Sequence, residues 1–107
     1  MFLKNKKFVI SAAGDGIGLS ISELIIEYGG IVYLTDIDQH KINKIHKNKK
    51  YKNKIFATQL DANNHKAVKE YFVSKLKIKK IDGLINNVGI AGPTKYLEKI
   101  SIDDWNS

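Results

Sequence analysis

A glycine-rich stretch near the N-terminus constrains the fold of this chain more than any other segment. Residues 8–18 read FVISAAGDGIG: an apolar run, then small residues with three glycines, and then the start of an apolar helical pattern. This order predicts a strand, a tight turn and a helix. The first turn of a helix leaves backbone N–H groups without intrahelical partners and carries the positive end of the helix dipole, so it stabilises an anion. Because such turns are common, the stretch alone leaves nucleotide binding open.

The residues around this turn predict a βαβ unit. Residues 7–11 are expected to form the first strand, and the sequence IVYL at residues 31–34 begins the second. One face of the helix between them is predicted to carry apolar side chains at helical spacing, namely Ile17, Ile21, Leu24, Ile25 and Tyr28. Gly29 and Gly30 mark the end of that helix. A strand, helix and strand within about 30 residues form a right-handed crossover between parallel strands.

An aspartate ends the second predicted strand, and it has two interpretations. Asp36 follows the glycine turn by about 20 residues, where a carboxylate can accept hydrogen bonds from the ribose hydroxyls of a bound adenosine. Alternatively, Asp36 and Asp38 could simply cap the start of the next helix. The combination of Asp36 with the glycine turn at this spacing favours the ribose interpretation.

The remainder of the chain repeats the alternation of strands and helices. Strands are predicted at residues 55–60 and 81–86, and a short helix with a solvated lysine face within residues 40–54. The helix that follows Asp61 is predicted to pack through four residues on one side: Val68, Tyr71, Phe72 and Leu76. This alternation predicts an α/β fold with a parallel sheet.

Composition narrows the class of protein. The chain has 107 residues, a length that limits it to one domain at most. It has no cysteine, which excludes disulfides, a thiolate nucleophile and a zinc-finger type of site. Its net charge is +7, and its 18 basic residues are all lysine. The chain has no arginine, and its basic stretch at residues 40–54 contains only one tyrosine, phenylalanine or tryptophan for base stacking, Tyr51, so no specific nucleic-acid partner is expected, although a lysine-rich nucleic-acid binder stays an alternative. No segment has the apolar length of a membrane span, so a cytoplasmic protein without a membrane partner is predicted.

Four motifs lie in register along the chain. The sequence SAAGDGIG at residues 11–18 matches a T-G-x-x-x-G-x-G turn, with serine and alanine in place of the threonine and first glycine. Asp36 and Asp61 follow the second and third predicted strands, and the sequence NNVG at residues 86–89 follows the fourth, where the pattern has N-N-A-G. The chain therefore resembles the N-terminal half of a short-chain dehydrogenase/reductase over essentially all of its length. The alanine at the first glycine position makes the tight turn less permissive than in the family pattern.

The resemblance implies the fold and a set of binding residues. The fold is α/β, a Rossmann-like doubly wound parallel sheet that is partial here, with four strands in the order 3-2-1-4 and helices on both faces. Residues 1–107 are then the N-terminal part of a single dinucleotide-binding domain, truncated at the start of the helix after Trp105. The implied cofactor-binding residues are Ser11, Gly14, Asp15, Gly16, Ile17, Gly18, Asp36, Ile37, Asp61, Ala62, Asn87, Val88 and Gly89.

The resemblance also implies a chemistry. It indicates an NAD(P)-dependent oxidoreductase that binds the dinucleotide for hydride transfer to or from a carbonyl or alcohol substrate. Asp15 and Asp36 favour NAD, because their charges would repel the additional 2′-phosphate of NADP. Lys41 and Lys44 weaken this preference for NAD, since a flexible lysine ammonium could reach the 2′-phosphate of NADP. A full-length form is expected to be a homo-oligomer, and the alternative function is that of a non-catalytic dinucleotide-binding module.

No catalytic residue of the family falls within the matched region. In the family a tyrosine of a Tyr-x-x-x-Lys pair transfers the proton, assisted by a serine and an asparagine, and all four lie beyond this region. Tyr71 and Lys75 have this spacing but are rejected, because they precede the N-N-x-G segment and lie on a packed helix, with Tyr71 expected at its rim. The chain alone is therefore predicted to be inactive and to expose a strand edge and apolar surface. No metal site is predicted, because the three histidines are expected at the surface: His40, His46 and His65.

Overall fold

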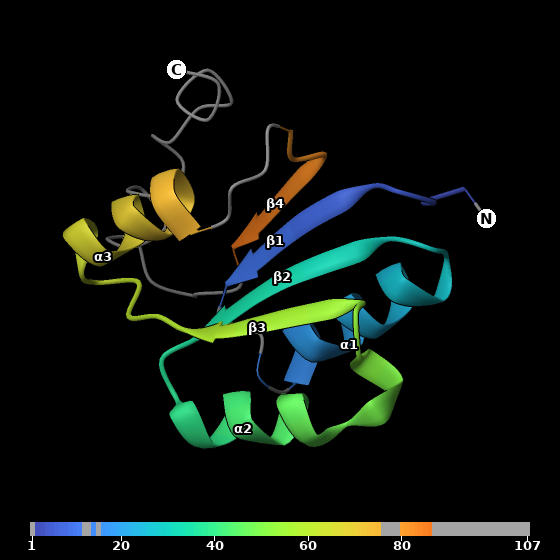
Figure 1. Ribbon diagram of the computed structural model, residues 1–107, viewed down its shortest axis with the longest axis horizontal. Coiled ribbons are helices and arrows are strands. Elements are labelled where there is room, and N and C mark those ends of the chain that lie inside the picture. The colour runs from blue at the N-terminus through green and yellow to red at the C-terminus, as the bar shows by residue number, and fades with distance from the viewer. Residues whose placement is uncertain (1, 12–13, 15, 76–79, 87–107) are drawn as a thin grey trace.

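The computed structural model describes residues 2–11, 14, 16–75 and 80–86, and a four-stranded parallel sheet forms its centre (Figure 1). The strands lie in the order β3-β2-β1-β4, which confirms the predicted topology. Every pair of neighbouring strands is parallel. The strand bounds are β1 Lys7–Ser11, β2 Ile31–Asp36, β3 Ile55–Gln59 and β4 Gly83–Asn86.

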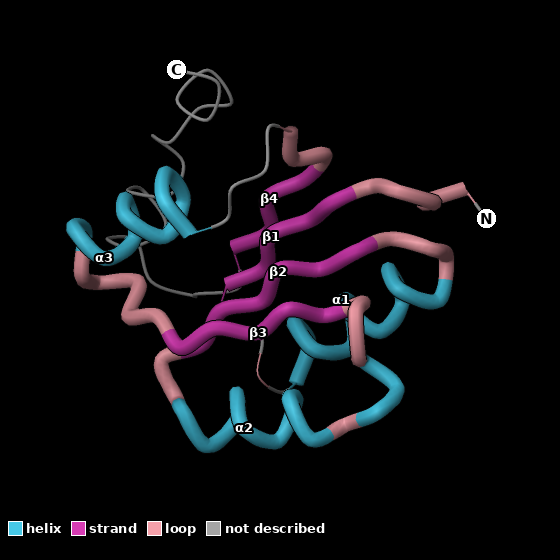
Figure 2. Tube along the Cα trace, viewed as in Figure 1, coloured by secondary structure: helices cyan, strands magenta, loops and turns pink. Residues whose placement is uncertain are grey.

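Helices cover both faces of the sheet, as predicted (Figures 1 and 2). The helices α1 (Gly16–Glu27) and α2 (Gln39–Lys47) pack on one face, and α3 (His65–Glu70) packs on the other. A 3-10 turn at Lys49–Tyr51 follows α2, and α3 continues as a π-helical turn over Tyr71–Lys75. The arrangement is that of a doubly wound α/β sheet.

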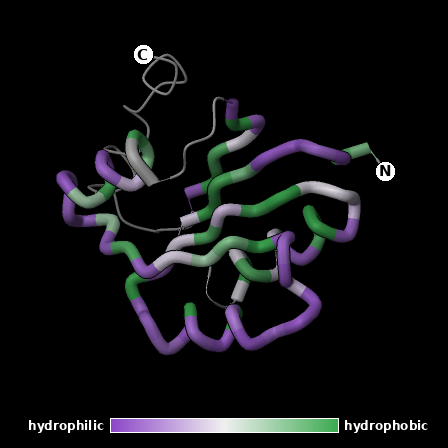
Figure 3. Tube along the Cα trace, in the orientation of Figure 1, coloured by the Kyte–Doolittle hydropathy of each residue, from purple (hydrophilic) through white to green (hydrophobic). Residues whose placement is uncertain are grey.

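Alternate residues of the central strands supply two separate hydrophobic cores. On β1, Ile10 contributes to the core beneath α1 and α2, whereas Val9 contributes to the core beneath α3. The larger core consists of Ile10, Ile25, Val32, Leu34, Ile42, Ile45, Tyr51, Ile55 and Ala57. The smaller core consists of Val9, Val68, Tyr71, Phe72 and Ile81. In Figure 3 the hydrophobic residues follow the strands and the hydrophilic ones follow α2, as expected when a parallel sheet is buried on both faces.

The strand β4 begins at Gly83, not at Ile81 as predicted. Ile81 turns into the smaller core, and Asp82 forms hydrogen bonds with Lys7 at the start of β1. The N–H of Asp82 donates to the carbonyl of Lys7 at 2.8 Å, and the Asp82 carboxylate accepts from the N–H of Lys7 at 2.9 Å. This backbone hydrogen bond, opposed by partial desolvation and aided by nearby lysine charges, lowers the pKa of the Asp82 carboxyl.

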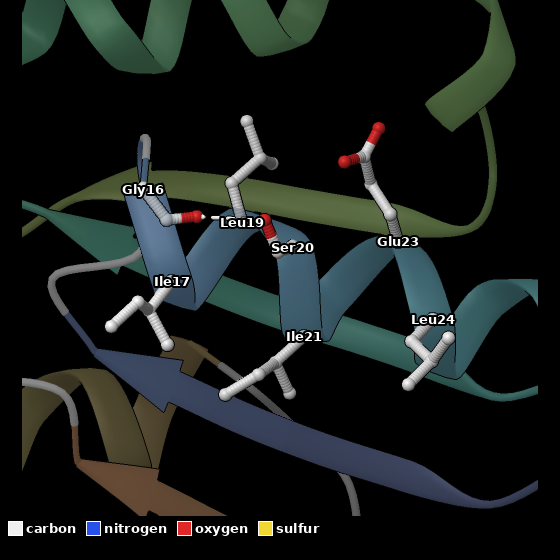
Figure 4. A pocket seen from close by; sticks show the side chains of 7 residues that line it. All are labelled: Gly16, Ile17, Leu19, Ser20, Ile21, Glu23 and Leu24. Atoms are coloured by element: carbon white, nitrogen blue, oxygen red, sulfur yellow. Dashed lines mark hydrogen bonds between the residues drawn. The ribbon is translucent and has the colours of Figure 1, made fainter.

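The buried face of α1 differs from the predicted one. Ile17 and Leu24 are 71% and 56% exposed, whereas the buried residues of the helix are Gly18, Ser22 and Ile25. In Figure 4, Ile17 and Leu24 project from the same flank of α1 and line an open hollow on the surface. The prediction is right for Ile25 and wrong for the exposed members of the predicted face, which are Ile17, Leu24 and Tyr28.

Small side chains explain this orientation of α1. Gly18 and Ser22 are one turn apart and face the sheet, which lets the helix backbone lie close to the strands. The hydroxyl of Ser22 is fully buried and donates to the carbonyl of Gly18 at 2.9 Å, so its burial costs little. The choice of face therefore depends on how closely α1 packs, and not only on which side of the helix is more apolar.

A hydrogen bond joins α1 to the 3-10 turn that follows α2. The hydroxyl of Tyr51 donates to Oε2 of Glu23 at 2.8 Å. Desolvation of the phenol, together with the hydrogen bond and the negative charge of Glu23, raises the pKa of Tyr51 to about 12. The protonated phenol is thus the form that the folded chain stabilises.

Replacing Ile25 by alanine is expected to lower the free energy of unfolding by about 3 kcal/mol, because the change leaves a cavity in the larger core. The same change at the neighbouring Leu24, which is 56% exposed, is the matched control and is expected to alter that free energy by less than about 0.5 kcal/mol. Urea unfolding followed by circular dichroism measures both effects. Equal losses at the two positions would contradict this orientation of α1.

The contribution of Tyr51 to stability is expected to disappear at high pH. Because its folded-state pKa of about 12 lies above the ordinary value of 10.0, the contribution is complete below pH 10 and is lost as the pH rises toward 12. The measurement is the difference in unfolding free energy between the wild type and Tyr51→Phe across this range. In Glu23→Gln, which keeps an acceptor oxygen without the charge, the folded-state pKa of Tyr51 should be lower, so the loss still begins near pH 10 but ends at a lower pH and is smaller. A difference that does not change with pH would refute the assignment.

Candidate functional site

The carboxyl ends of the four parallel strands lie at one edge of the sheet (Figure 2), and the described members of the predicted site end or follow β1, β2 and β3. The strand β1 ends at Ser11, which lies in register with Thr35 of β2 and with Asn86 of β4. The strand β2 ends at Asp36, which lies in register with Gln59 at the end of β3. Because β3 and β4 lie on opposite sides of the β1–β2 pair, the strand order reverses at β1. Open α/β sheets bind ligands outside the carboxyl ends of the strands at such a switch point.

Ser11 links the ends of β1 and β4. Its side chain is buried, and its hydroxyl donates to Oδ1 of Asn86 at 2.7 Å. This hydrogen bond joins residues 75 positions apart and aligns the two strand ends on either side of the switch point. Ser11 therefore supports the shape of the edge from within the sheet.

Two glycines shape the junction between β1 and α1. Gly16, the first residue of α1, has a φ of +63°, a left-handed conformation in which an L side chain is strained. Gly18 is buried on the sheet side of the helix. Because α1 starts so soon after β1, its amino end, with the unpaired N–H groups of its first turn, lies at the carboxyl edge of the sheet.

Asp36 connects this junction to the end of β2. Its Oδ2 accepts a hydrogen bond from the N–H of Gly14 at 2.9 Å, and its Oδ1 accepts one from the N–H of Asp38 at 2.9 Å. The cap of α2 is Asp38, whose side chain accepts from the N–H of His40. The capping interpretation is therefore correct for Asp38, whereas Asp36 is oriented toward the glycine turn.

Sequence reasoning missed the hydrogen bond between Gly14 and Asp36. The two residues are 22 positions apart, so helical or strand periodicity cannot reveal the contact. The sequence does contain one signal for this contact. Gly14 stands at a variable position of the T-G-x-x-x-G-x-G pattern, and a glycine that the pattern does not require indicates that this chain needs the absence of a side chain there.

The remaining described site residues follow β2 and β3. Ile37 comes directly after Asp36 and is 59% exposed, which leaves an apolar side chain at the edge of the sheet. Asp61 and Ala62 are half-buried after β3, and Oδ1 of Asp61 accepts from the N–H of Asn63 at 2.9 Å. The Leu60 N–H donates to the carbonyl of Asp36, which holds this segment beside the end of β2. The other predicted site residues lie outside the described residues: Asp15, Asn87, Val88 and Gly89.

Tyr71 is a core residue and not the rim residue that was predicted. It is 3% exposed in the core beneath α3, and no hydrogen-bond partner for its hydroxyl occurs among the described residues. Desolvation, with a smaller contribution from Tyr33, raises its pKa well above the usual range. Such a phenol holds its proton, which agrees with the rejection of the Tyr71 and Lys75 pair as a catalytic pair.

The histidines lie at the surface, as predicted. All three are exposed, and Nε2–H of His46 donates to the carbonyl of Ala57 at 2.8 Å. Among the residues that the structure describes, no group of three His, Cys, Asp or Glu side chains could hold a metal ion. In the same part of the chain, no helix combines the length and the apolar character needed to cross a membrane.

These features define a class of protein. A doubly wound parallel sheet with a glycine-containing turn after β1 and a carboxylate at the end of β2 is a Rossmann-type arrangement. The sequence profile of the short chain dehydrogenase family matches residues 6–107. The chain belongs to the short-chain dehydrogenase family, whose members are NAD(P)-dependent oxidoreductases.

Curated relatives and solved structures agree with this assignment. The chain is 33% identical over 106 residues to meso-2,3-butanediol dehydrogenase of Serratia marcescens, and 28% identical over 100 residues to the NADP-dependent 3-hydroxy acid dehydrogenase YdfG of Escherichia coli O6:H1. These alignments cover 98% and 92% of this chain but 41% and 40% of the two relatives. The crystal structure of 2-keto-3-deoxy-D-gluconate dehydrogenase from Streptococcus agalactiae superposes with a TM-score of 0.70 at 32% identity, over 83% of this chain and 34% of that one. The chain thus spans about two fifths of the length of the curated relatives that it matches.

Replacing Tyr71 by phenylalanine is expected to leave the free energy of unfolding unchanged or to raise it by up to about 1 kcal/mol, because the change removes a buried hydroxyl without a described partner. Tyr51→Phe is the matched control. It removes the same atom but also the hydrogen bond to Glu23, and should lower the free energy by about 1 kcal/mol. Urea unfolding at neutral pH measures both variants. If Tyr71→Phe destabilises the chain as much as Tyr51→Phe does, the hydroxyl of Tyr71 is hydrogen-bonded.

Proposed function

We propose that this chain forms the cofactor-binding half of an NAD(P)-dependent oxidoreductase. The observation that carries the proposal is the hydrogen bond from Gly14 to Asp36, which places the glycine turn beside the end of β2 at the switch-point edge. A turn at the amino end of a helix suits the pyrophosphate of a dinucleotide. A carboxylate at the neighbouring strand end suits the hydroxyls of the adenosine ribose.

The residues present fit such a cofactor. The positive φ of Gly16, with open space where its Cβ would be, leaves the backbone at the start of α1 accessible to a phosphate. Asp36 has oxygen lone pairs beyond the two backbone hydrogen bonds that it accepts. Ile37 offers an apolar surface for the adenine. The proposed binding set is Ser11, Gly14, Asp15, Gly16, Ile17, Gly18, Asp36, Ile37, Asp61, Ala62, Asn87, Val88 and Gly89.

The nicotinamide cofactor, when bound, supplies the hydride chemistry, and the protein supplies binding and orientation. The names of the two curated relatives, a butanediol dehydrogenase and a hydroxy acid dehydrogenase, support an alcohol or carbonyl substrate. We assign no proton-transfer residue in this chain, since Tyr71 is buried and keeps its proton. The 107 residues are therefore proposed to bind the cofactor without turning over a substrate.

We further propose that the chain prefers NAD to NADP. If the ribose binds beside Asp36, as we propose, the charge of Asp36 would repel a 2′-phosphate, as would the charge of Asp15. Two observations favour NADP instead. The Escherichia coli relative is named as NADP-dependent, and Lys41 lies close to Gly14. We give the carboxylate more weight, because Asp36 is buried and held by two backbone hydrogen bonds, so its position is fixed.

Titration calorimetry is expected to show NAD⁺ binding at least about tenfold more tightly than NADP⁺ at low salt. Asp36→Asn should narrow this ratio, because it removes the charge and keeps one acceptor oxygen. Asp82→Asn, the same change at the opposite end of the sheet, is the control and should leave the ratio unchanged. Equal or tighter binding of NADP⁺ would overturn the preference, and no binding of either dinucleotide at millimolar concentration would overturn the proposed function.

A further inference from the structure

The glycine turn is held to the rest of the fold through the carboxylate of Asp36. The hydrogen bond from the N–H of Gly14 to Oδ2 of Asp36 is buried and 2.9 Å long. Asp36 itself is only 7% exposed, and its second oxygen accepts from the N–H of Asp38 at 2.9 Å. One carboxylate thus joins the turn after β1 to the start of the segment that leads into α2.

Packing around Gly14 leaves no room for a side chain. A Cβ atom at this position would lie 2.7 Å from Cβ of Lys41 and 2.8 Å from Oδ2 of Asp36. Lys41 belongs to the first turn of α2, so the backbone of Gly14 packs directly against side chains at the junction between β2 and α2. In contrast, Gly16 has open space where its Cβ would be, and there the backbone conformation alone calls for glycine.

We propose that Asp36 is a positioning residue for the glycine turn, in addition to any contact that it makes with a ribose. Its carboxylate fixes the backbone of Gly14, and this contact sets the shape of the turn that faces the pyrophosphate. The inference rests on the proposed dinucleotide binding. It differs from the ribose role in one respect: Asp36 then affects the binding of a pyrophosphate group even when the ligand has no ribose hydroxyls.

The geometry favours this role over a purely ribose-directed one. The two oxygens of Asp36 already accept one backbone hydrogen bond each in the ligand-free chain, and a hydrogen bond to a charged group is among the stronger ones. Loss of the carboxylate would leave the buried N–H of Gly14 without its acceptor. The turn would then have to rearrange to satisfy that group, because unpaired buried N–H groups are rare in folded proteins.

The test uses ADP and 2′,3′-dideoxy-ADP, which differ only in the ribose hydroxyls. Titration calorimetry on the chain is expected to show that Asp36→Ala weakens the binding of 2′,3′-dideoxy-ADP by a factor of about ten or more, and the binding of ADP by at least as much, because ADP also loses its contact between Asp36 and the ribose hydroxyls. Asp36→Asn, which keeps one acceptor oxygen, should weaken both by less. Asp82→Ala is the matched control, because its carboxylate also accepts a backbone N–H from a distant residue, Lys7, but at the opposite end of the sheet. It should leave both affinities unchanged.

A second measurement needs no ligand. Amide hydrogen exchange at Gly14 is expected to accelerate about tenfold in Asp36→Ala and to stay unchanged in Asp82→Ala. A loss of affinity confined to ADP, with unchanged exchange at Gly14, would overturn the positioning role and leave the proposed function intact. If the wild type bound neither nucleotide, the proposed function would fail, and exchange at Gly14 alone would then decide whether Asp36 holds the turn.

Discussion

The close packing of two side chains, Asp36 and Lys41, against the backbone of Gly14 at the carboxyl edge of the sheet is the constraint on which the site depends. The turn after β1, the end of β2 and the first turn of α2 meet at Gly14, where no side chain fits between them. A buried carboxylate joins them, because Asp36 accepts backbone N–H groups from two of these segments. A buried charge is tolerated when it is hydrogen-bonded in this way, so the same contacts that stabilise the edge also orient the turn.

The packing of α1 on the sheet places the amino end of this helix at the same carboxyl edge. Gly18 and Ser22 face the sheet and let the helix lie close to the strands, so that its amino end starts directly after β1. An adjacent flank of the helix carries large apolar side chains that the described part of the chain leaves exposed, as Figure 4 shows for Ile17 and Leu24.

Membership of the short-chain dehydrogenase family accounts for the sheet, the turn and the position of the acidic residue together. The departures from the family pattern are local. An alanine replaces the first glycine of the turn, and glycine occurs instead at Gly14, where the structure leaves no room for a Cβ atom. The requirement for glycine in this chain therefore includes a position that the family pattern leaves variable.

The alternation of strands and helices, the glycine turn and the placement of Asp36 at the end of β2 could be predicted from the residues, because these depend on local periodicity and turn chemistry. The strand order 3-2-1-4 followed from the resemblance to the family. Three features emerged only from the folded chain: which face of α1 is buried, that Tyr71 belongs to the core, and where β4 begins. The tertiary structure also revealed the bond between Gly14 and Asp36. Each of these depends on how closely distant segments approach one another, and side-chain size at a contact such as Gly18 can outweigh the hydrophobic pattern of a single helix.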